Sequence, residues 1–579
     1  MSIFTTRPLI MGTKAVVAAG HYLAAVAGMR ILERGGNAID SAAAIGLSLA
    51  VLEAHMNSIG GEVPMLIYVA KEERVVAVSG QGPAGLQAKI DWFKSRGIEM
   101  IPGDGFLPAV VPSVVGSWVE VLTRFGTMSF AQVAQPAIEL AEDGYPLQLA
   151  LRDLIAANAE RFVREWPTTA RIFLPNSQLP EEGYVLRQQE LAQTLRSLVG
   201  AERTSSHTDR GGRLDAVRRE FYEGKIARKI EEFISKNEIM DATGHPHRGL
   251  LTYEDFARYK TRIEGPVSCG YRDFEIYKCG PWTQGPVFLQ QIGILEGFDL
   301  PSLGHNSSDY IHLFVEAAKM AFADREKYYG DPDFDRVPLE KLLSKEYARK
   351  RGQEIDMNHA RLSVEAGPVP KAASTAAGKT RQGDTTHLDA VDREGNMVSA
   401  TQSGGWINSS PIIEGLGFAL STRGQMFFLD ARRNNALAPG KRPRTTLTPS
   451  LAFRNGKPFM VFGTPGGDMQ DQWSLQFFLN YAEFGMNLQQ AIDAPSFHTL
   501  HFPSSFYPRT AEPGKIIVEG RIPSRVTEEL RSKGHIVEET GDWENGRVSA
   551  VMRDSERGII VGGASPKMIY GNTAYAIGW

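Results

Sequence analysis

Cysteine is almost missing from this chain. Only Cys269 and Cys279 occur among its 579 residues, so the disulfide framework of a small secreted protein is excluded. The two lie ten residues apart on a predicted strand pair, and the sequence leaves open whether they form one bridge. Because the N-terminus also lacks a convincing signal peptide, we predict a reducing, cytoplasmic location.

Long hydrophobic runs and a surplus of basic charge are lacking too. The most apolar stretch, residues 41–54, is too short for the roughly 20 residues that a bilayer-spanning helix needs, which predicts a buried core helix and no membrane contact. A formal net charge of -4 argues against nucleic acid or anionic lipid as a partner. The histidines show no metal-ligand spacing, and we expect neither a metal nor another cofactor.

Nucleotide binding has only weak support. Residues 373–380 satisfy the loose pattern in which Ala or Gly, then four residues of any kind, precede Gly-Lys-Thr. A working phosphate loop follows a buried strand and opens a helix, whereas residues 367–370 read Gly-Pro-Val-Pro. A nucleotide-dependent enzyme is therefore the remotest of the hypotheses that the sequence leaves open.

Composition changes sharply between residues 365 and 383. The stretch reads EAGPVPKAASTAAGKTRQG, with small and polar residues, two prolines and no apolar face, which predicts a flexible linker. Residues before it show mixed helix and strand patterns, with a polar segment at 200–213 that predicts a surface loop. Residues after it show hairpin patterns that predict sheets covered by helices.

The clearest single elements can be named by their ranges. Helical periodicity predicts helices over residues 130–143, 308–328, 473–484 and 523–533. Alternating patterns predict strands at 65–68 and 74–78 and, behind the linker, three hairpins at 385–392 with 397–403, 451–453 with 459–462, and 548–552 with 559–561.

A threonine stands at the junction of the linker and the first strand behind it, within Asp384-Thr385-Thr386-His387. If the chain were cut before Thr385, that residue would carry both an attacking hydroxyl and a free amine. Such an amine titrates near 7.7 to 8.0 in model peptides, so it can act as the general base for its own hydroxyl. The alternative is that both threonines are ordinary β-branched strand residues, and the wider sequence has to decide between the two.

That wider sequence resembles the gamma-glutamyltransferase family nearly end to end. The resemblance is carried by motifs in the family's order: GGNAIDSAAA at 35–44, HMNSIGGEVPM at 55–65, FYEGKIA at 221–227, ADREKYYGDPDF at 323–334, GDTTHLDAVDREGN at 383–396, PRTTLTPS at 443–450 and GTPGGD at 463–468. It implies an α+β class protein with the four-layer αββα sandwich of N-terminal-nucleophile hydrolases. It also implies a precursor that cleaves itself between Asp384 and Thr385.

The two products of that cleavage would stay associated. Residues 1–384, including the linker 365–384, would form a large chain, and residues 385–579 a small catalytic chain. The resemblance implies that Thr385 attacks the carbonyl of Asp384 during maturation and a substrate amide afterwards. Whether the pair of chains forms a homo-oligomer stays open.

The resemblance also assigns the groups around the nucleophile. Ser403 stands where the family has a second hydroxyl that touches the N-terminal amine, although it could be an ordinary strand serine. Gly466 and Gly467 match the glycine pair whose backbone N–H groups form the family's oxyanion hole, with a simple tight turn as the alternative. Thr445, Thr446 and Gln425 match substrate-pocket residues.

Two departures concern recognition of the substrate. The family's transferases grip the glutamyl carboxylate with an arginine of the large chain, but residues 78–83 contain none. An aspartate that holds the α-amino group is replaced by Phe428, which offers an ammonium no counter-charge. Nearby arginines that could recruit a carboxylate instead are Arg423, Arg432, Arg433, Arg442 and Arg444.

We therefore predict an amide hydrolase with an altered acyl pocket, similar to the family's oxamate amidohydrolase-like or cephalosporin acylase-like branches. A gamma-glutamyltransferase or glutathione hydrolase is the second hypothesis. A third, from another class, is an uncleaved pseudoenzyme that serves as a binding protein. The acyl group and the acceptor, water or an amine, stay open.

Overall fold

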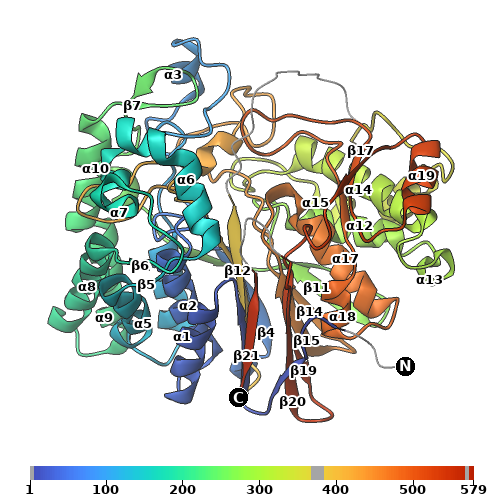
Figure 1. The fold of residues 1–579 in the computed structure, drawn as a ribbon, viewed down its shortest axis with the longest axis horizontal. Coiled ribbons are helices and arrows are strands. Elements are labelled where there is room, and N and C mark those ends of the chain that lie inside the picture. Colours follow the sequence, from blue (N-terminus) through green and yellow to red (C-terminus); the bar gives the residue numbers. More distant parts are fainter. Residues whose placement is uncertain (1–4, 367–383, 568–572) are drawn as a thin grey trace.

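Two antiparallel sheets lie face to face at the centre of the molecule, and helices cover both outer faces (Figure 1). The computed structural model describes residues 5–366, 384–567 and 573–579. This is the four-layer αββα sandwich of the α+β class, and the predicted fold is confirmed. The linker predicted at 365–383 and the phosphate-loop-like residues 373–380 fall almost wholly outside the described residues.

The sheet that carries the threonine is the first of the two. Its strands in spatial order are β21 (Tyr575–Gly578), β2 (Ala15–Ala19), β12 (Thr385–Asp392), β13 (Met397–Ser403), β3 (Met65–Val69), β4 (Arg74–Ser79) and β9 (Arg262–Glu264).

The second sheet has seven strands as well. In spatial order they are β1 (Ile10–Gly12), β20 (Ile559–Ala564), β19 (Ser549–Asp554), β15 (Lys457–Gly463), β14 (Ser450–Arg454), β11 (Phe274–Lys278) and β10 (Val267–Tyr271). Smaller sheets pair β5 (Tyr145–Pro146) with β6 (Val185–Leu186), β7 (Ile239–Met240) with β8 (Pro246–His247), and β17 (Lys515–Glu519) with both β16 (Phe497–Thr499) and β18 (Ile536–Thr540).

Both sheets combine strands from residues 5–366 with strands that follow residue 383. In the first sheet β2 lies between β21 and β12, and β13 pairs with β3. In the second sheet β1 pairs with β20, and β11 pairs with β14. The residues on either side of position 384 therefore form one continuous fold. The chain boundary at 384 stays a prediction.

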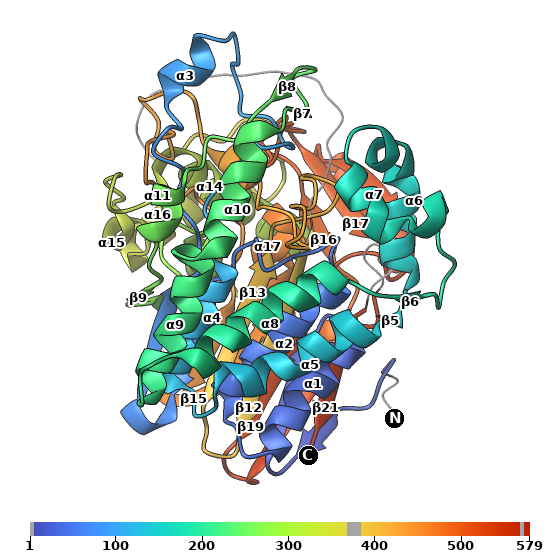
Figure 2. The ribbon, with the colours of Figure 1, turned by 90° about the vertical axis from the view of Figure 1, so that its left-hand side faces the viewer.

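One helical layer covers the first sheet and faces the viewer in Figure 2. Its helices are α1 (Tyr22–Glu33), α2 (Ala38–Leu52), α4 (Val114–Phe125), α5 (Phe130–Asp143), α8 (Gln189–Thr204), α9 (Arg210–Tyr222) and α10 (Lys225–Lys236). Every residue of α2 is buried, because its small side chains let it lie between the sheet and the outer helices. A Cβ at Gly46 would come within 2.5 Å of the Trp118 ring.

The second helical layer covers the other sheet. Its helices are α12 (Gly285–Leu295), α14 (Ser308–Tyr328), α16 (Lys345–Gln353), α17 (Gln470–Ala482), α18 (Leu488–Asp493) and α19 (Ser524–Ser532). Short helices elsewhere are α3 (Ile90–Lys94), α7 (Pro167–Phe173), α11 (Tyr253–Ala257), α13 (Leu300–Leu303) and α15 (Leu339–Leu342), and a longer one is α6 (Leu149–Arg164).

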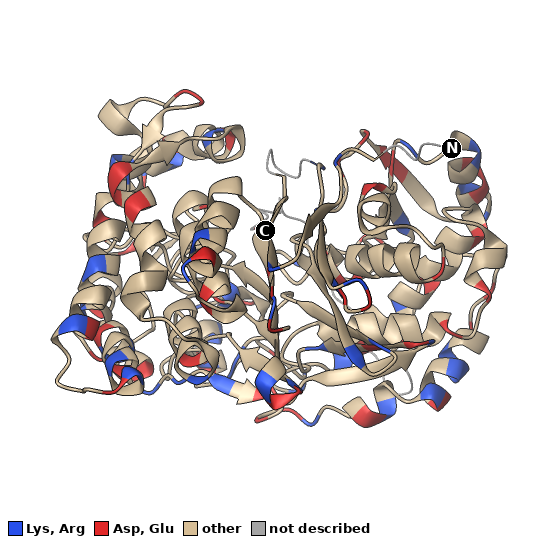
Figure 3. Cartoon of the chain, turned by 90° about the horizontal axis from the view of Figure 1, so that it is seen from below, with Lys and Arg blue, Asp and Glu red and all other residues tan. Residues whose placement is uncertain are grey.

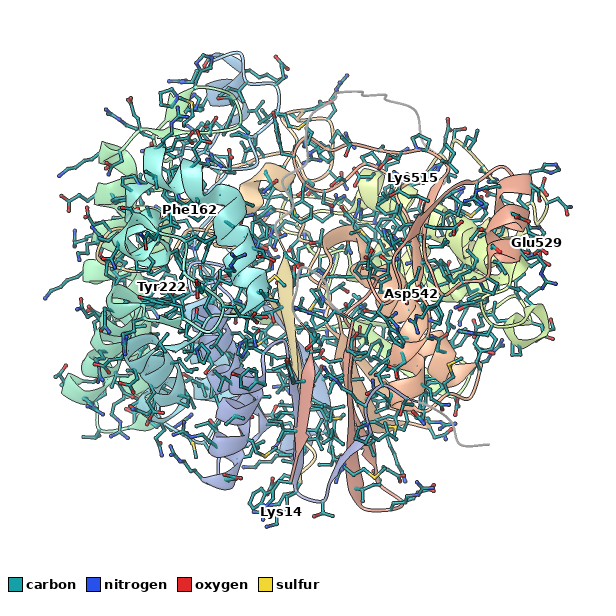
Figure 4. All side chains as sticks on the ribbon, viewed as in Figure 1. Lys14, Phe162, Tyr222, Lys515, Glu529 and Asp542 are labelled. Atoms are coloured by element: carbon teal, nitrogen blue, oxygen red, sulfur yellow. The ribbon has the colours of Figure 1, made fainter. Side chains whose placement is uncertain are left out.

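Apolar side chains fill the space between the layers (Figure 4). Phe162 and Tyr222, labelled in Figure 4, lie in the helical half on the left, where both are fully buried. Acidic and basic residues are interspersed along the outer helices (Figure 3). Among the described residues no helix combines the length and apolarity needed to span a bilayer, and the cytoplasmic location stays a prediction.

Several predicted elements match the structure closely. Helices at 130–143 and 308–328 and strands at 385–392 and 397–403 agree to the residue. The surface loop predicted at 200–213 is wrong, because α8 runs to Thr204 and α9 begins at Arg210. Helix α9 buries Leu214 and Val217, which lie just after the polar stretch.

The two cysteines are free thiols. Cys269 lies on β10 opposite Ile276 of β11, as the predicted strand pair requires. Cys279 follows the end of β11 and is buried, with its Sγ 3.6 Å from the carbonyl oxygen of Met65. Burial raises the pKa of both thiols, so neither is an activated nucleophile.

Candidate active site

Thr385 and Ser403 face each other at one end of a hairpin in the first sheet. Thr385 is the first residue of β12 and Ser403 the last of β13, and the strand register pairs them directly. Their hydroxyl oxygens are 3.2 Å apart, and both side chains are buried. The short turn at residues 393–396 fixes this register, so the hairpin itself brings the two predicted hydroxyls together.

The Ser403 oxygen has three polar neighbours, and its single proton decides their roles. It donates to the carbonyl oxygen of Asp384 at 2.9 Å and accepts from Nη2 of Arg423 at 2.8 Å. A hydroxyl has one donor and two acceptor positions, so the remaining position accepts the proton of the Thr385 hydroxyl. Ser403 thereby contacts both the Thr385 hydroxyl and the carbonyl group of the preceding peptide bond.

The carbonyl group of Asp384 receives a second donor. Nε1 of Trp406 lies 2.6 Å from the Asp384 oxygen and 2.8 Å from the carbonyl oxygen of Met56. Two donors, Trp406 and Ser403, therefore point at the oxygen that would become negative if the Thr385 hydroxyl attacked this carbonyl. Donors aimed at developing charge are the usual means of stabilising a tetrahedral intermediate.

A buried ion pair between Arg423 and Glu62 contacts Ser403. Arg423 Nε donates to Glu62 at 2.6 Å, and Glu62 exchanges backbone hydrogen bonds with Ser403. Burial raises the pKa of Glu62, while Arg423 and a hydrogen bond from Ser421 oppose the rise. Because Arg423 donates to both Glu62 and Ser403, it holds the Ser403 hydroxyl in position.

The side chain of Asp384 is buried beside the same peptide bond. One carboxyl oxygen accepts from the Thr385 amide at 2.8 Å, and the other has no hydrogen-bond partner among the described residues. Burial raises the pKa of the Asp384 carboxyl to about 7, although the Arg547 guanidinium opposes the rise. Arg547 also donates to the carbonyl oxygen of Thr385 at 3.3 Å. A buried, poorly satisfied carboxyl thus lies directly before Thr385.

Gly466 and Gly467 form the turn between β15 and α17. Both have left-handed backbone conformations, with φ of +123° and +54°. A Cβ at Gly466 would lie 2.3 Å from the Trp473 ring and one at Gly467 would lie 2.9 Å from Phe506, so glycine is required for conformation and for space. Among the described residues, neither backbone N–H donates to a protein acceptor.

The loop around Phe506 connects this turn with Asp384. The Phe506 ring packs 6.1 Å from the Trp406 ring, and Trp406 donates to Asp384. Arg547 makes a second connection, because its amide donates to Thr464 and its guanidinium to Thr385. The structure thus brings the glycine turn and the threonine to the same region.

The three predicted pocket residues differ in how they connect to the groups around Thr385. Thr446 belongs to the site through Arg423, whose Nη1 lies 3.5 Å from its hydroxyl. The Thr445 hydroxyl instead accepts from the Leu447 amide, within its own turn. Gln425 bridges two loops, since it donates to the Gly103 carbonyl and accepts from the Tyr507 amide.

The arginines suggested by the sequence are mostly engaged with carboxylates. Arg442 binds Asp331 and Glu264 and also donates to Ser79 in the stretch that lacks an arginine of its own. The others pair as follows: Arg444 with Glu326, exposed Arg432 with Asp430, and Arg423 with Glu62. Arg433 pairs more loosely with Glu326, at 3.7 Å from its carboxylate, and donates to its main-chain carbonyl oxygen at 3.4 Å. Its guanidinium carbon also lies 3.6 Å from the centre of the Phe428 ring.

Sequence reasoning missed the roles of Trp406, Glu62 and Arg547. Glu62 lies within the motif at 55–65, and the contact with Arg423 was not evident because 361 residues separate them. Trp406 follows two glycines with positive φ, Gly404 and Gly405. An isolated tryptophan just after such a pair is the one signal that could have drawn attention to it.

A cluster of potential metal ligands lies in the other helical layer. His312, Glu316 and His535 are all buried, with ligand atoms within 4.8 Å of one another, although the sequence showed no such spacing. The Glu316 carboxylate is bonded to Nζ of Lys319 at 2.6 Å, and His312 to His535 at 2.8 Å. The other carboxylate oxygen of Glu316 and Nδ1 of His535 are buried and have no hydrogen-bond partner among the described residues.

Comparisons with known proteins agree on one family. The family model described as Gamma-glutamyltranspeptidase matches residues 24–575. The Glutathione hydrolase-like YwrD proenzyme of Bacillus subtilis (strain 168) is 33% identical, over 96% of this chain and 98% of that protein. The solved structure of LmbA2991HD is 40% identical, with a TM-score of 0.95 over 100% of both chains. Cephalosporin acylase from Bacillus halodurans is 30% identical, with a TM-score of 0.85 over 100% of this chain and 98% of that one.

Proposed function

Because the chain belongs to the gamma-glutamyltranspeptidase family, we propose that it is a self-processing amide hydrolase whose nucleophile is Thr385. The family places it among enzymes that hydrolyse amides or transfer their acyl groups. The observation that carries the finer proposal is the Thr385 hydroxyl, held 3.2 Å from Ser403 beside a carbonyl that already has two hydrogen-bond donors. The relative named as a proenzyme supports a single precursor that becomes two associated chains.

Maturation begins with attack of the Thr385 oxygen on the carbonyl carbon of Asp384. Negative charge moves to the Asp384 oxygen, where the N–H of Trp406 and the O–H of Ser403 stabilise it. The C–N bond then breaks, the Thr385 nitrogen takes the proton released by its hydroxyl, and an ester joins the two residues. Water hydrolyses this ester to the carboxylate of Asp384 and the free hydroxyl and amine of Thr385.

The mature enzyme uses the same hydroxyl on an external amide. The new amine of Thr385 accepts the hydroxyl proton, and the oxygen attacks the substrate carbonyl. The amides of Gly466 and Gly467 stabilise the resulting oxyanion, and the proton passes to the leaving amine. Water then releases the acyl group from Thr385 as a carboxylic acid.

The acyl pocket differs from one built for a gamma-glutamyl group. Phe428 offers no negative charge to an α-ammonium group, and Ser79 and Gln81 occupy the stretch that carries the family's arginine. The proposed substrate is therefore a small-molecule amide whose acyl group lacks a free α-amino group. A gamma-glutamyl amide is the second candidate, supported by the name of the YwrD relative.

Intact mass and N-terminal sequencing of purified protein test the proposal. A chain that begins Thr-Thr-His-Leu is expected, together with a larger chain. Thr385→Ala should leave a single full-length chain without amidase activity. An uncut wild-type protein would support the pseudoenzyme hypothesis, and cleavage of Thr385→Ala at the same bond would rule out the mechanism.

A further inference from the structure

The cluster of His312, Glu316 and His535 lies where α14 packs against α19, at the right of Figure 1. His312 and Glu316 are one helical turn apart on α14, so their side chains leave the same face of the helix. His535 stands between α19 and β18. Sequence spacing did not indicate this cluster, because 223 residues separate the two histidines. The fold alone brings three metal-ligating side chains into one buried place.

The hydrogen bonds of the two imidazoles show where their lone pairs are. Burial lowers the pKa of both, that of His535 to about 2, so both rings are neutral. Nε2 of His312 lies 2.8 Å from the carbonyl oxygen of Asp356, and it carries the proton because a carbonyl only accepts. Nδ1 of His312 therefore accepts from Nε2 of His535, at 2.8 Å. This leaves Nδ1 of His535 as a buried acceptor without a partner among the described residues.

The carboxylate of Glu316 is only half satisfied. Its Oε1 accepts from Nζ of Lys319 at 2.6 Å and from the Arg361 amide at 3.4 Å. Its Oε2 is buried and has no hydrogen-bond partner in the part of the chain that the structure describes. A buried acceptor without a partner costs free energy. Two such acceptors, one on Glu316 and one on His535, stand in the same cluster, and a bound cation would satisfy acceptors gathered in this way.

The chemistry of these ligands suits zinc. Zn²⁺ binds neutral imidazole nitrogen and carboxylate oxygen, whereas Mg²⁺ and Ca²⁺ prefer oxygen alone. The bond from His312 to the Asp356 carbonyl is the kind of contact that orients a zinc-binding histidine. Two ligands of a tetrahedral zinc ion lie about 3.3 Å apart. The two histidine nitrogens, now 2.8 Å apart, would separate by about 0.5 Å to admit the ion.

Two lysines near the cluster oppose a cation. Lys533 acts on His535 but is paired with Asp309 at 2.9 Å. Lys319 is closer, because its ammonium donates to Glu316 and to the carbonyl oxygen of Arg361. It therefore competes with an ion for the charge of the carboxylate. Since Lys319 occupies one oxygen of Glu316 only, the competition lowers the affinity for an ion and leaves the second oxygen available.

We propose that His312, Glu316 and His535 bind one zinc ion, with water as the fourth ligand. The ion ties helix α14 to the residue that follows α19, and so stabilises the second helical layer. This inference does not depend on the proposed function, because none of the three ligands contacts the groups around Thr385 in the described structure. If the chain is cut before Thr385 as proposed, the ion also joins the large chain to the small one, because two ligands precede the cut and one follows it.

Zinc titration of the purified protein tests the proposal. After removal of metals with EDTA, competition with a chromogenic chelator should show one Zn²⁺ per protein molecule, with a Kd of about 1 μM or below, and Mg²⁺ should not compete. His535→Gln should weaken zinc binding by about 100-fold, because even changes to groups that only orient metal ligands cost about 10- to 100-fold. Lys319→Met should tighten it by about 10- to 100-fold, because the competing charge is removed.

His305→Gln is the matched control, because His305 is a partly buried histidine just before α14 that bonds to Asn480. It should leave the zinc affinity unchanged. Co²⁺ in place of zinc should give the visible absorption of a four-coordinate site, and His535→Gln should abolish it. Equal zinc binding by the wild type and a folded His535→Gln would show adventitious surface binding and overturn the inference. A wild type that binds no zinc would overturn it even if His535→Gln failed to fold.

Thermal unfolding separates this inference from the proposed function. Zinc at about 100 times its Kd should raise the melting temperature of both the wild type and Thr385→Ala by a few degrees, and excess EDTA should reverse the rise. An uncut wild type that gains stability from zinc would refute the proposed function alone. A cut, active enzyme whose melting temperature does not respond to zinc or to EDTA would refute this inference alone.

Discussion

Trp406→Phe is expected to slow maturation about 100-fold. The change removes the N–H that lies 2.6 Å from the carbonyl oxygen of Asp384 and keeps an aromatic ring in place. Loss of one oxyanion donor costs about 3 to 4 kcal/mol in transition-state stabilisation. Since the Trp406 N–H is shared with Met56 and Ser403 keeps its own bond, we expect the lower end of the corresponding range of about 100- to 1,000-fold.

The assay is a time course of precursor cleavage on denaturing gels, starting from freshly synthesised chain. Trp118→Phe is the control, because Trp118 is equally buried and loses one N–H bond, to Gln402, that does not involve Asp384. It should be destabilised to a similar degree but cleaved at the wild-type rate. If Trp406→Phe matures as fast as wild type, or if both variants slow equally, the role given to the indole N–H is wrong.

The remaining predictions concern the carboxyl before the cut and the glycine turn. The first of these uses Thr385→Ala, which should stay uncut. In the folded state of this variant the pKa of Asp384 is raised from 3.8 to about 7, so the protonated carboxyl favours the folded state. This contribution to stability is fully present below pH 3.8 and is lost as pH rises to about 7. Asp384→Asn should remove this loss, which amounts to at most about 4 kcal/mol, and urea unfolding between pH 4 and 8 would show parallel curves if the prediction fails. Gly466→Ala should lower turnover about 100-fold, because its Cβ would collide with Trp473, whereas Gly440→Ala, which has open space at the same sign of φ, should keep wild-type turnover. Equal activity of the two glycine variants on any amide substrate would contradict the assignment of the turn.

Local elements could be predicted from the sequence where the pattern is unambiguous. The hairpin at 385–403 was predicted to the residue because apolar alternation and the turn at 393–396 point to the same register. The polar composition of residues 200–213 predicts a loop, but much of this stretch is helical. The apolar residues that α9 buries lie just after the stretch. Hydrophobic periodicity is visible in a sequence only where one face of a helix is buried, and an exposed helix end buries few residues.

The site could be predicted only where a motif marks it. Thr385, Ser403 and the glycine pair stood in recognisable segments, whereas Trp406, Glu62 and Arg547 depend on contacts between residues far apart in the chain. Three-dimensional packing is what separates these residues from their neighbours.

Each sheet contains strands from both sides of position 384, and this has a consequence for refolding. Strand β2 lies between β21 and β12, and β11 pairs with β14, so each piece supplies strands that the other needs. Before cleavage all of these pairings form within one molecule, and refolding follows first-order kinetics. If the chain is cut before Thr385 as proposed, the same pairings require two molecules to meet, so recovery from denaturant should depend on protein concentration. The enzyme would then assemble efficiently only once, as an intact chain.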